Sequence, residues 1–485
     1  RCQKAGLGKR RGSSTTRSCE SFSPAATGVP AMIMVADSLP GLKGVLRRSG
    51  VSGTAAAMAT RLIAAFIFHS GRMSCLQAAA TVRSESRHRA QVSRFLAKGV
   101  ALVSGVGDWL REELLQHESS LGTYVFVVDA TLCGQAGKTA ENTYSTGNRQ
   151  RRPRKGRRHS GYRYHRRSCH AFTAGLLLTP SGTRIPVLKP YFTREYCQAR
   201  RIDHCTTAEA AAAMVRELKV PAGAPVIVVG DTAYESQVVR EACEARGFRW
   251  IFPCNHERVL EGPQGRRVRV RSLMDDRSAW SWQTIRLVPS RGVFAAYRRL
   301  SRHRIGPKVK SRTYHVHEER HCVRSVGAAR IIFSTMSKDA KKARLADTKI
   351  LLTNDADLSV RDIVDIYSLR WQVELFFKEL KSSLGFTRYR FKRFAAVEAW
   401  ASLAITTFLY LEWYRAKQLR SSRLAAEGKR WWIPQRTHGL CQAIRLATEE
   451  AEMDSIAKRL QTPGGINRLK DLLKRGFAHE YRAAM

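Results

Sequence analysis

The hydrophobic and polar positions divide the chain into helical regions and a central region of alternating strands and helices. From Leu39 to His117 the pattern is rich in Ala and Leu with few β-branched runs, which predicts helices. From Tyr124 onward, short β-branched and aromatic runs alternate with segments of helical periodicity. After Phe391 the pattern is helical again. The chain is therefore expected to hold an α/β region between two helical regions.

Two short apolar runs in the central region each end in a carboxylate. Tyr124–Ala130 (YVFVVDA) predicts a buried strand that carries Asp129. Ala224–Tyr234 (APVIVVGDTAY) predicts a second buried strand, which runs into Asp231. Both acids are thus expected at strand ends.

The elements between and after these strands predict a mixed sheet covered by helices. Turn residues at Thr179–Gly182 predict a hairpin, and helices are expected at Thr206–Leu218 and Glu235–Gly247, followed by a strand at Phe248–Cys254. The order is strand, hairpin, helix, strand, helix, strand. It resembles the ribonuclease H-like topology, an α/β fold in which acidic residues gather at neighbouring strand ends.

The charge of the chain points to a polyanionic partner. It has 84 Lys or Arg against 40 Asp or Glu, a formal net charge of +44, so nucleic acid comes first and an anionic membrane surface second. The apolar stretches Leu62–Phe68 and Trp400–Leu411 are shorter than the roughly 20 residues that span a bilayer. The eleven cysteines form no C-x-x-C pair, which argues against a zinc ribbon. A cytoplasmic protein without a membrane partner is expected.

One helical segment, Val364–Phe386, separates an apolar face from a charged one. At about 100° per residue, the charged arc is about 80° wide and holds a single carboxylate, Glu374, whereas Glu379 lies on neither arc. An acid among cations is most often a surface ion-pair lattice, and that alternative stays open for this helix. The members of the charged arc are Tyr367, Arg370, Glu374, Lys378 and Lys381.

Three carboxylates at one sheet edge would repel one another unless they held cations. Asp129, Asp231 and Glu374 are therefore candidate catalytic residues and metal ligands. Two Mg²⁺ ions about 3.5–4 Å apart, or Mn²⁺ in their place, would stabilise the attacking and leaving oxygens of a phosphoryl displacement. The neighbouring Tyr367, Arg370 and Lys381 are expected to hold the adjacent phosphodiester.

These residues resemble a known family. The spacing Tyr-x2-Arg-x3-Glu-x6-Lys, present from Tyr367 to Lys381, is similar to the signature of the YREK group of DDE insertion-sequence transposases. Asp129 in VVDAT and Asp231 in VVGDTAY look like the first two catalytic aspartates of that group. The resemblance covers about residues 124–400. It implies metal-dependent cleavage at transposon ends and strand transfer into target DNA.

The resemblance also implies partners and a location. Double-stranded DNA, as terminal inverted repeats and as target, is the expected partner, and a homodimer is expected in the DNA complex. The expected location is the nucleoid in the cytoplasm of a bacterial host. Two alternatives remain: a metal-dependent nuclease of the same fold without strand transfer, and a catalytically silent, sequence-specific DNA-binding protein derived from a transposase.

Further DNA contacts are expected outside the carboxylate cluster. The run Arg149–Arg167 holds ten Lys or Arg and no acid, and it predicts a DNA-contacting loop, with a solvated loop as the alternative. An aromatic that holds a flipped base is implied by the resemblance, although packed core tryptophans are the favoured interpretation of the two candidates. The predicted DNA contacts are Arg157, Arg158, Arg166 and Lys378, and the speculative base contacts are Trp280 and Trp282.

The predicted organisation has five parts. Residues 1–31 are expected to be disordered, and residues 32–120 to form a helical region that is a candidate DNA-end-binding domain. Residues 121–254 and 347–400 are expected to form the ribonuclease H-like catalytic domain. Residues 255–346 predict a β-rich insertion, and residues 401–485 a helical C-terminal region.

Overall fold

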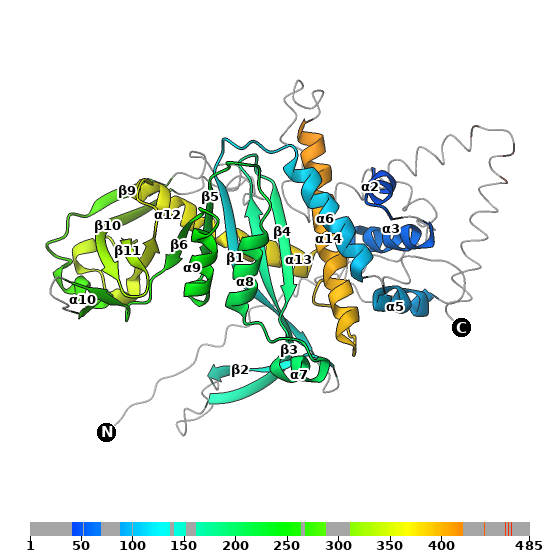
Figure 1. Cartoon of the computed structure of the whole chain (residues 1–485), viewed down its shortest axis with the longest axis horizontal. Helices are drawn as coiled ribbons and strands as arrows, with labels where there is room; N and C mark the ends of the chain where they lie inside the picture. The colour runs from blue at the N-terminus through cyan, green and yellow to red at the C-terminus, as the bar shows by residue number, and fades with distance from the viewer. Residues whose placement is uncertain are drawn as a thin grey trace, which may run out of the picture. The chain divides into compact units, whose positions relative to one another are not determined.

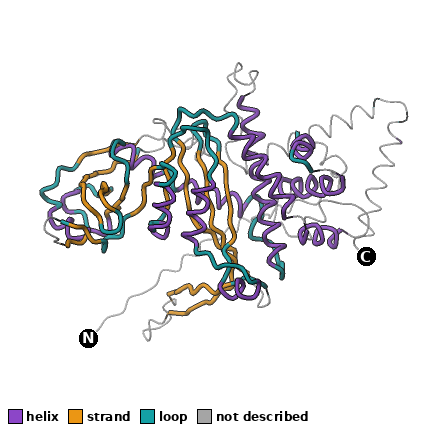
Figure 2. The backbone as a smooth tube through the Cα atoms, viewed as in Figure 1, coloured by secondary structure: helices purple, strands orange, loops and turns teal. Residues whose placement is uncertain are grey.

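The computed structural model describes most of the central chain (Figures 1 and 2). The described ranges are 41–51, 53–68, 88–98, 100–135, 140–151, 162–262, 267–287 and 311–420, with a few single positions beyond them. Contacts divide the chain into one unit of residues 34–452 and one formed by its two ends. Only the first is described below. The predicted disorder of residues 1–31 and most of the predicted C-terminal region lie outside the described residues.

The described strands form a single sheet of twelve strands (Figure 2). Their order is β2-β3-β1-β5-β6-β12-β11-β10-β7-β8, with β4 paired to β3 and β9 paired to β10. The strands are β1 Tyr124–Gln135, β2 Tyr144–Arg151, β3 Tyr162–Leu178, β4 Arg184–Pro190, β5 Val226–Gly230, β6 Arg249–Pro253, β7 Val259–Glu261, β8 Arg267–Arg269, β9 Gln283–Leu287, β10 Arg312–Val323, β11 Gly327–Thr335 and β12 Thr348–Thr353.

The helices flank this sheet and its ends. They are α2 Leu42–Arg48, α3 Gly53–Phe68, α5 His88–Lys98, α6 Val100–Leu115, α7 Arg194–Arg200, α8 Thr207–Glu217, α9 Gln237–Glu244, α10 Val270–Leu273, α12 Val360–Ser368, α13 Trp371–Ser382 and α14 Phe394–Arg420. Short 3-10 turns are η1 Thr232–Tyr234, η3 Met274–Asp276, η4 Ala340–Lys342 and η5 Leu345–Asp347. The helix predicted from Thr206 is confirmed as α8, which starts with a capping box between Thr206 and Glu209.

The strands β4-β3-β1-β5-β6 confirm the predicted fold class. β3 runs antiparallel to both β1 and β4, whereas β1, β5 and β6 run parallel to one another. The hairpin between β3 and β4 turns at Gly182, whose φ of 95° is a conformation that glycine adopts without steric cost. In Figure 1, α8 and α9 lie in front of these strands and α13 passes behind them, in contact with β1. This mixed sheet flanked by helices is consistent with a ribonuclease H-like fold.

The β-rich insertion continues the sheet of β1, β5 and β6. β12 pairs with β6 on one side and with β11 on the other, so β9, β10 and β11 extend the same hydrogen-bonded array. Within the predicted β-rich insertion, the alternating segment Arg267–Leu273 is a strand only as far as Arg269, because Val270 already begins helix α10. The stretch 292–300 of the predicted insertion lies outside the described residues.

The helical segment predicted at Val364–Phe386 is interrupted. α12 ends at Ser368 and α13 begins at Trp371, and the connection is made by i→i−3 hydrogen bonds such as Arg370 N–H to the Tyr367 carbonyl at 3.0 Å. The Ser368 hydroxyl donates to the Asp365 carbonyl at 2.6 Å. Such a bond competes with the helical ladder and favours a break there. A single wheel therefore does not describe both halves of the segment.

Helix α14 is the core of the helical part. It contacts α3, α5, α6 and strand β4, and it runs without a break across the boundary predicted after residue 400. It is the one described helix that is long and apolar enough to cross a membrane, but 78% of its apolar window is buried inside the protein. Trp400, Phe408 and Tyr410 are fully buried. The apolar composition of α14 is therefore explained by packing.

A buried ion-pair cluster ties the sheet to two helices. Arg184 on β4 donates to Glu412 on α14 at 2.7 Å and lies 3.1 Å from Glu379 on α13. Arg415 pairs with Glu412 at 2.7 Å and donates to the Gly182 carbonyl at 3.0 Å. Burial alone would raise the pKa of Glu412, but Arg415 and Arg184 hold it below its usual value. Glu379 thus has a structural partner, in agreement with its exclusion from the charged arc.

Candidate active site

Asp129 and Asp231 lie side by side on neighbouring strands. The expectation that both lie at strand ends is correct for Asp231 but wrong for Asp129, because β1 continues to Gln135 and stays paired with β3 there. β1 and β5 pair in parallel with Val128 opposite Gly230, so Asp129 and Asp231 occupy the next position on each strand. The Ala130 N–H donates to Asp129 Oδ1 at 2.7 Å. Asp231 caps the turn η1, where it accepts from the Ala233 N–H at 2.9 Å. These local bonds fix each carboxylate directly after the last residue pair of β1 and β5, Val128 and Gly230.

The third acid, Glu374, is linked to Asp129 by Arg370. Glu374 lies on α13, which packs against β1. Arg370 Nη2 donates to Glu374 Oε1 at 2.9 Å, and Arg370 Nη1 lies 3.6 Å from Asp129 Oδ2. The structure therefore brings Asp129, Asp231, Glu374 and Arg370 into one cluster.

The electrostatics of the cluster are those of crowded carboxylates. Burial raises the pKa of Asp129, and the negative charges of Asp231 and Glu374 raise it further. The Ala130 N–H and the Arg370 guanidinium oppose that shift without cancelling it. Ionisation of Asp129 is therefore less favourable in the folded chain than in the unfolded chain, because the carboxylate is partly desolvated and faces like charges. A cation at this point would relieve the repulsion.

The donor set suits a divalent ion. The three acids supply only carboxylate oxygens, which are the ligands that Mg²⁺ prefers. In the described part of the chain, no three acidic, His or Cys side chains are arranged closely enough to hold a metal. Arg370 instead contacts two of the carboxylates. Asp129 and Asp231 are the pair most directly available to an ion, since Glu374 is paired with Arg370.

Tyrosine and lysine side chains surround the cluster. Tyr367 shares a side-chain hydrogen bond with Arg370, and burial raises its pKa to about 12. Lys381 interacts electrostatically with Asp129 and with Cys133, and its burial lowers its pKa. Lys378 is exposed on α13. The tyrosine, the arginine and Lys381 of the predicted set are thus gathered beside the acids.

The basic run between β2 and β3 is described only in part. The first residues of β3, up to Arg167, pair with β2 and not with β1, so this hairpin extends beyond the main sheet (Figure 1). Arg157 and Arg158 lie outside the described residues. Arg166 lies on β3, but its side chain is outside the described part. The DNA contacts predicted for these three arginines stay predictions.

The two tryptophans of the insertion are packed. Trp280 is 7% exposed and stacks on His317 with ring centres 4.3 Å apart. The indole N–H of Trp282 donates to the Arg277 carbonyl at 3.0 Å. This agrees with the favoured interpretation of both as core residues, and a base-contacting role stays a prediction.

Trp371 and Lys349 were not singled out from the sequence. Trp371, at the start of α13 beside Arg370, is 56% exposed. On the helical wheel at about 100° per residue it lies about 20° outside the charged arc, so the arc did not include it. Lys349, near the start of β12, lies with Nζ 5.6 Å from the centre of the Tyr367 ring. No local pattern marks Lys349, since only the pairing of β12 with β6 brings it there.

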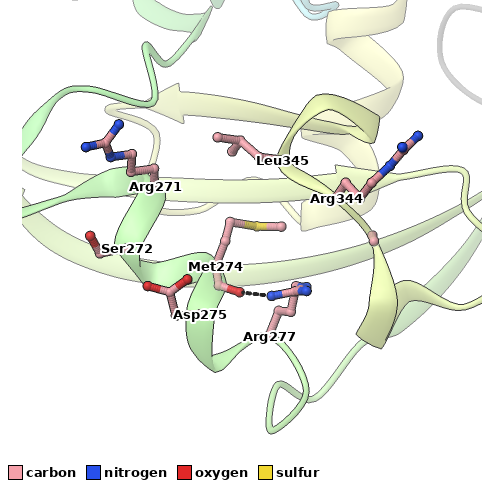
Figure 3. A pocket seen from close by; sticks show the side chains of 8 residues that line it. Arg271, Ser272, Met274, Asp275, Arg277, Arg344 and Leu345 are labelled. Carbon is pink, nitrogen blue, oxygen red and sulfur yellow. Dashed lines mark hydrogen bonds between the residues drawn. The ribbon is translucent and has the colours of Figure 1, made fainter.

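A cavity of about 400 Å³ lies in the insertion (Figure 3). Met274 and Leu345 line it beside Ser272 and Asp275. Each of its three arginines is held by an oxygen of the protein. Arg271 pairs with the Glu257 carboxylate and Arg344 with the Asp347 carboxylate, while Arg277 donates to the Met274 carbonyl. These arginines are engaged by the protein itself, and the carboxylate cluster remains the candidate active site.

Replacement of Asp129 by Asn should stabilise the metal-free protein at neutral pH. Because the folded-state pKa of Asp129 is raised, ionisation costs stability: the carboxyl contributes fully below the unfolded value of about 3.9, and this contribution is lost as pH rises through the folded pKa. Asn keeps an oxygen that accepts from the Ala130 N–H. Thermal unfolding in EDTA should therefore give a higher Tm for Asp129→Asn at pH 7 and no difference near pH 3.5. A lower Tm at pH 7 would contradict the proposed repulsion.

Two family comparisons match the chain. Residues 198–410 match a family described as transposase DDE domain, and residues 49–278 match one described as DDE superfamily endonuclease. The first stretch includes Asp231 and Glu374, and the second includes Asp129 and Asp231. A search of curated proteins found no match. The two matches support a DDE transposase family for this chain and imply a nuclease of the transposase type. Such families typically use divalent metal ions.

Proposed function

We propose that this protein is a DNA transposase of the YREK-signature group, which cleaves transposon ends and transfers the freed strand into target DNA. The observation that carries the proposal is the placement of Asp129 beside Asp231 on neighbouring strands and, through Arg370, beside Glu374. The spacing from Tyr367 to Lys381 supports the subgroup. The two family matches support the class of chemistry.

In a phosphoryl displacement, the acids of the cluster would bind the metal ions and its basic and tyrosine side chains would bind the DNA. Asp129, Asp231 and Glu374 would hold Mg²⁺ or Mn²⁺, which when bound supplies charge stabilisation to the attacking and leaving oxygens. Arg370 neutralises Asp129 and Glu374 before DNA arrives, and its planar guanidinium then suits a phosphate. Lys381 and Tyr367, beside the acids, orient the phosphodiester next to the reacting one.

The excess positive charge supports DNA as the substrate. A formal charge of +44 favours approach of a polyanion to a site whose few acids lie among cations. Binding should therefore weaken steeply as salt rises, because each phosphate contact releases counterions. Double-stranded DNA of the transposon ends and of the target is the proposed partner, with a homodimer in the DNA complex and a nucleoid location in a bacterial cell.

Incubation of the purified protein with a plasmid that carries its gene and native flanking DNA tests the proposal. We expect cleavage at inverted repeats in Mg²⁺ or Mn²⁺, none in EDTA, and joined products when a second plasmid is present. Cleaved donor without joined product would instead indicate a nuclease of the same fold. Binding to the flanking DNA without any product in either metal would indicate a catalytically silent DNA-binding protein.

A further inference from the structure

The sheet topology brings a cation to the edge where the acids lie. β1, β5 and β6 run parallel, so their C-terminal ends share one edge of the sheet. β12 is antiparallel to β6, which places the N-terminal end of β12 at that same edge. Lys349 is the second residue of β12, and Asp231 directly follows β5. Lys349 and Asp231 therefore lie at the same edge of the sheet, which is called the rim below.

The contacts of Lys349 place it on the Tyr367 side of the cluster. Its Nζ lies 5.6 Å from the centre of the Tyr367 ring, within the range of a cation–π contact. It interacts electrostatically with Arg370, which repels it, and with Asp231, which attracts it. In the described part of the chain Lys349 makes no ion pair, whereas Lys189 and Lys219 each pair with a carboxylate.

These observations indicate an anion-binding position. Lys349 and Arg370 are like charges that both interact with Tyr367, and an anion between them would turn their repulsion into two attractions. Lys381 interacts with Asp129 and Cys133, whereas Lys349 interacts with Asp231. Lys349 and Lys381 thus interact with different acids of the same cluster, Asp231 and Asp129.

We propose that Lys349 is a further DNA-positioning residue, which binds a backbone phosphate of the substrate strand beside Asp231. The inference rests on the proposed function, because it assumes that the cluster acts on DNA. Lys349 would hold the strand from the β12 side while Lys381 holds it from the β1 side. Neither the charged arc of α13 nor the spacing of its residues includes Lys349.

The test compares Lys349→Ala and Lys349→Arg with Lys219→Ala. Lys219 is an exposed lysine paired with Glu112, and it lies beyond α8, before the start of β5 and away from the acid-bearing strand ends. The activity assay uses the plasmid that carries the gene and its flanking DNA. The binding assay uses a labelled duplex copied from that flanking DNA, over a range of salt concentrations. Thermal unfolding of each variant separates folding from DNA binding.

We expect Lys349→Ala to lower cleavage about tenfold to hundredfold, as the loss of a hydrogen bond to a charged group does. The salt dependence of its DNA affinity should fall by about 0.9 in log–log slope, the value of one phosphate contact. Lys349→Arg should keep most of both, and Lys219→Ala should match the wild type. The Tm of Lys349→Ala should stay near that of the wild type.

Two results would overturn the inference about Lys349. One is a Lys349→Ala variant with the cleavage rate and salt slope of Lys219→Ala. The other is lost cleavage with an unchanged salt slope and a lowered Tm, which would mark Lys349 as structural. If the wild type cleaves nothing in Mg²⁺ or Mn²⁺, the proposed function fails, and the salt slope alone then decides whether Lys349 binds phosphate.

Discussion

Replacing any one of the three clustered acids by its amide should lower metal-dependent DNA cleavage by about 1,000-fold or more. A metal ion stabilises the transition state by several kcal/mol, and about 1.4 kcal/mol corresponds to a factor of ten in rate. Asp129→Asn, Asp231→Asn and Glu374→Gln each remove one carboxylate from the oxygen donors. Cleavage of the plasmid with the native flanking DNA, in Mg²⁺ and in Mn²⁺, measures the loss.

The amide variants should still bind DNA, because they remove negative charge from a positive surface. A gel shift with the flanking duplex at fixed salt checks this. Asp108→Asn is the matched control, since Asp108 is exposed and paired with Arg111 on α6. It should cleave at the wild-type rate. Normal cleavage by all three amide variants would show that the cluster is not the active site.

The second large effect is expected at the buried ion-pair cluster. Arg184→Met should lower the free energy of unfolding by about 3–5 kcal/mol, because breaking a buried pair leaves charge uncompensated. Glu412 would keep Arg415, but both Glu379 and Glu412 would lose the cation that they share. Urea unfolding followed by tryptophan fluorescence suits the test, because Trp400 and Trp413 lie on α14.

Lys189→Met is the control for this prediction. Lys189 lies on the same strand and pairs with Glu217, but both side chains are partly exposed. Such pairs contribute about 0–1 kcal/mol, so the control should stay close to the wild type. Arg184→Lys keeps the charge without the planar fork and should fall between the two. A cost for Arg184→Met as small as that of Lys189→Met would mean that the cluster adds nothing to stability.

The sequence was sufficient to predict most of the helices and strands, and most of the residues that lie beside the acids. Asp129 and Asp231 each follow a buried run of β-branched residues. Such a run predicts a strand from local sequence alone. The capping box at Thr206 and the positive φ of Gly247 are local too, so the ends of α8 and α9 were close to expectation. The same local logic placed Glu374 on the charged arc and left Glu379 outside it.

The tertiary structure decided what depends on distant segments. The break at Ser368 separates Tyr367 from the helix of Glu374, yet Arg370 still joins them. Local periodicity did not reveal this break, because the apolar positions keep their helical spacing on both sides of it, although the Ser368–Asp365 bond that favours the break joins residues only three apart. The burial of Trp280 likewise depends on strands β10 and β11, which lie well beyond it in the chain.

The sequence by itself determined the candidate residues for the proposed chemistry: three carboxylates, their neighbouring cations and a strongly basic chain. Only the tertiary structure decided that Arg370 lies between Asp129 and Glu374, and that Lys349 belongs to the same rim. The physical reason is that strand ends and helix faces follow from local periodicity. The edge of the sheet at which they meet follows from pairing between segments that are distant in the chain, such as β6 with β12.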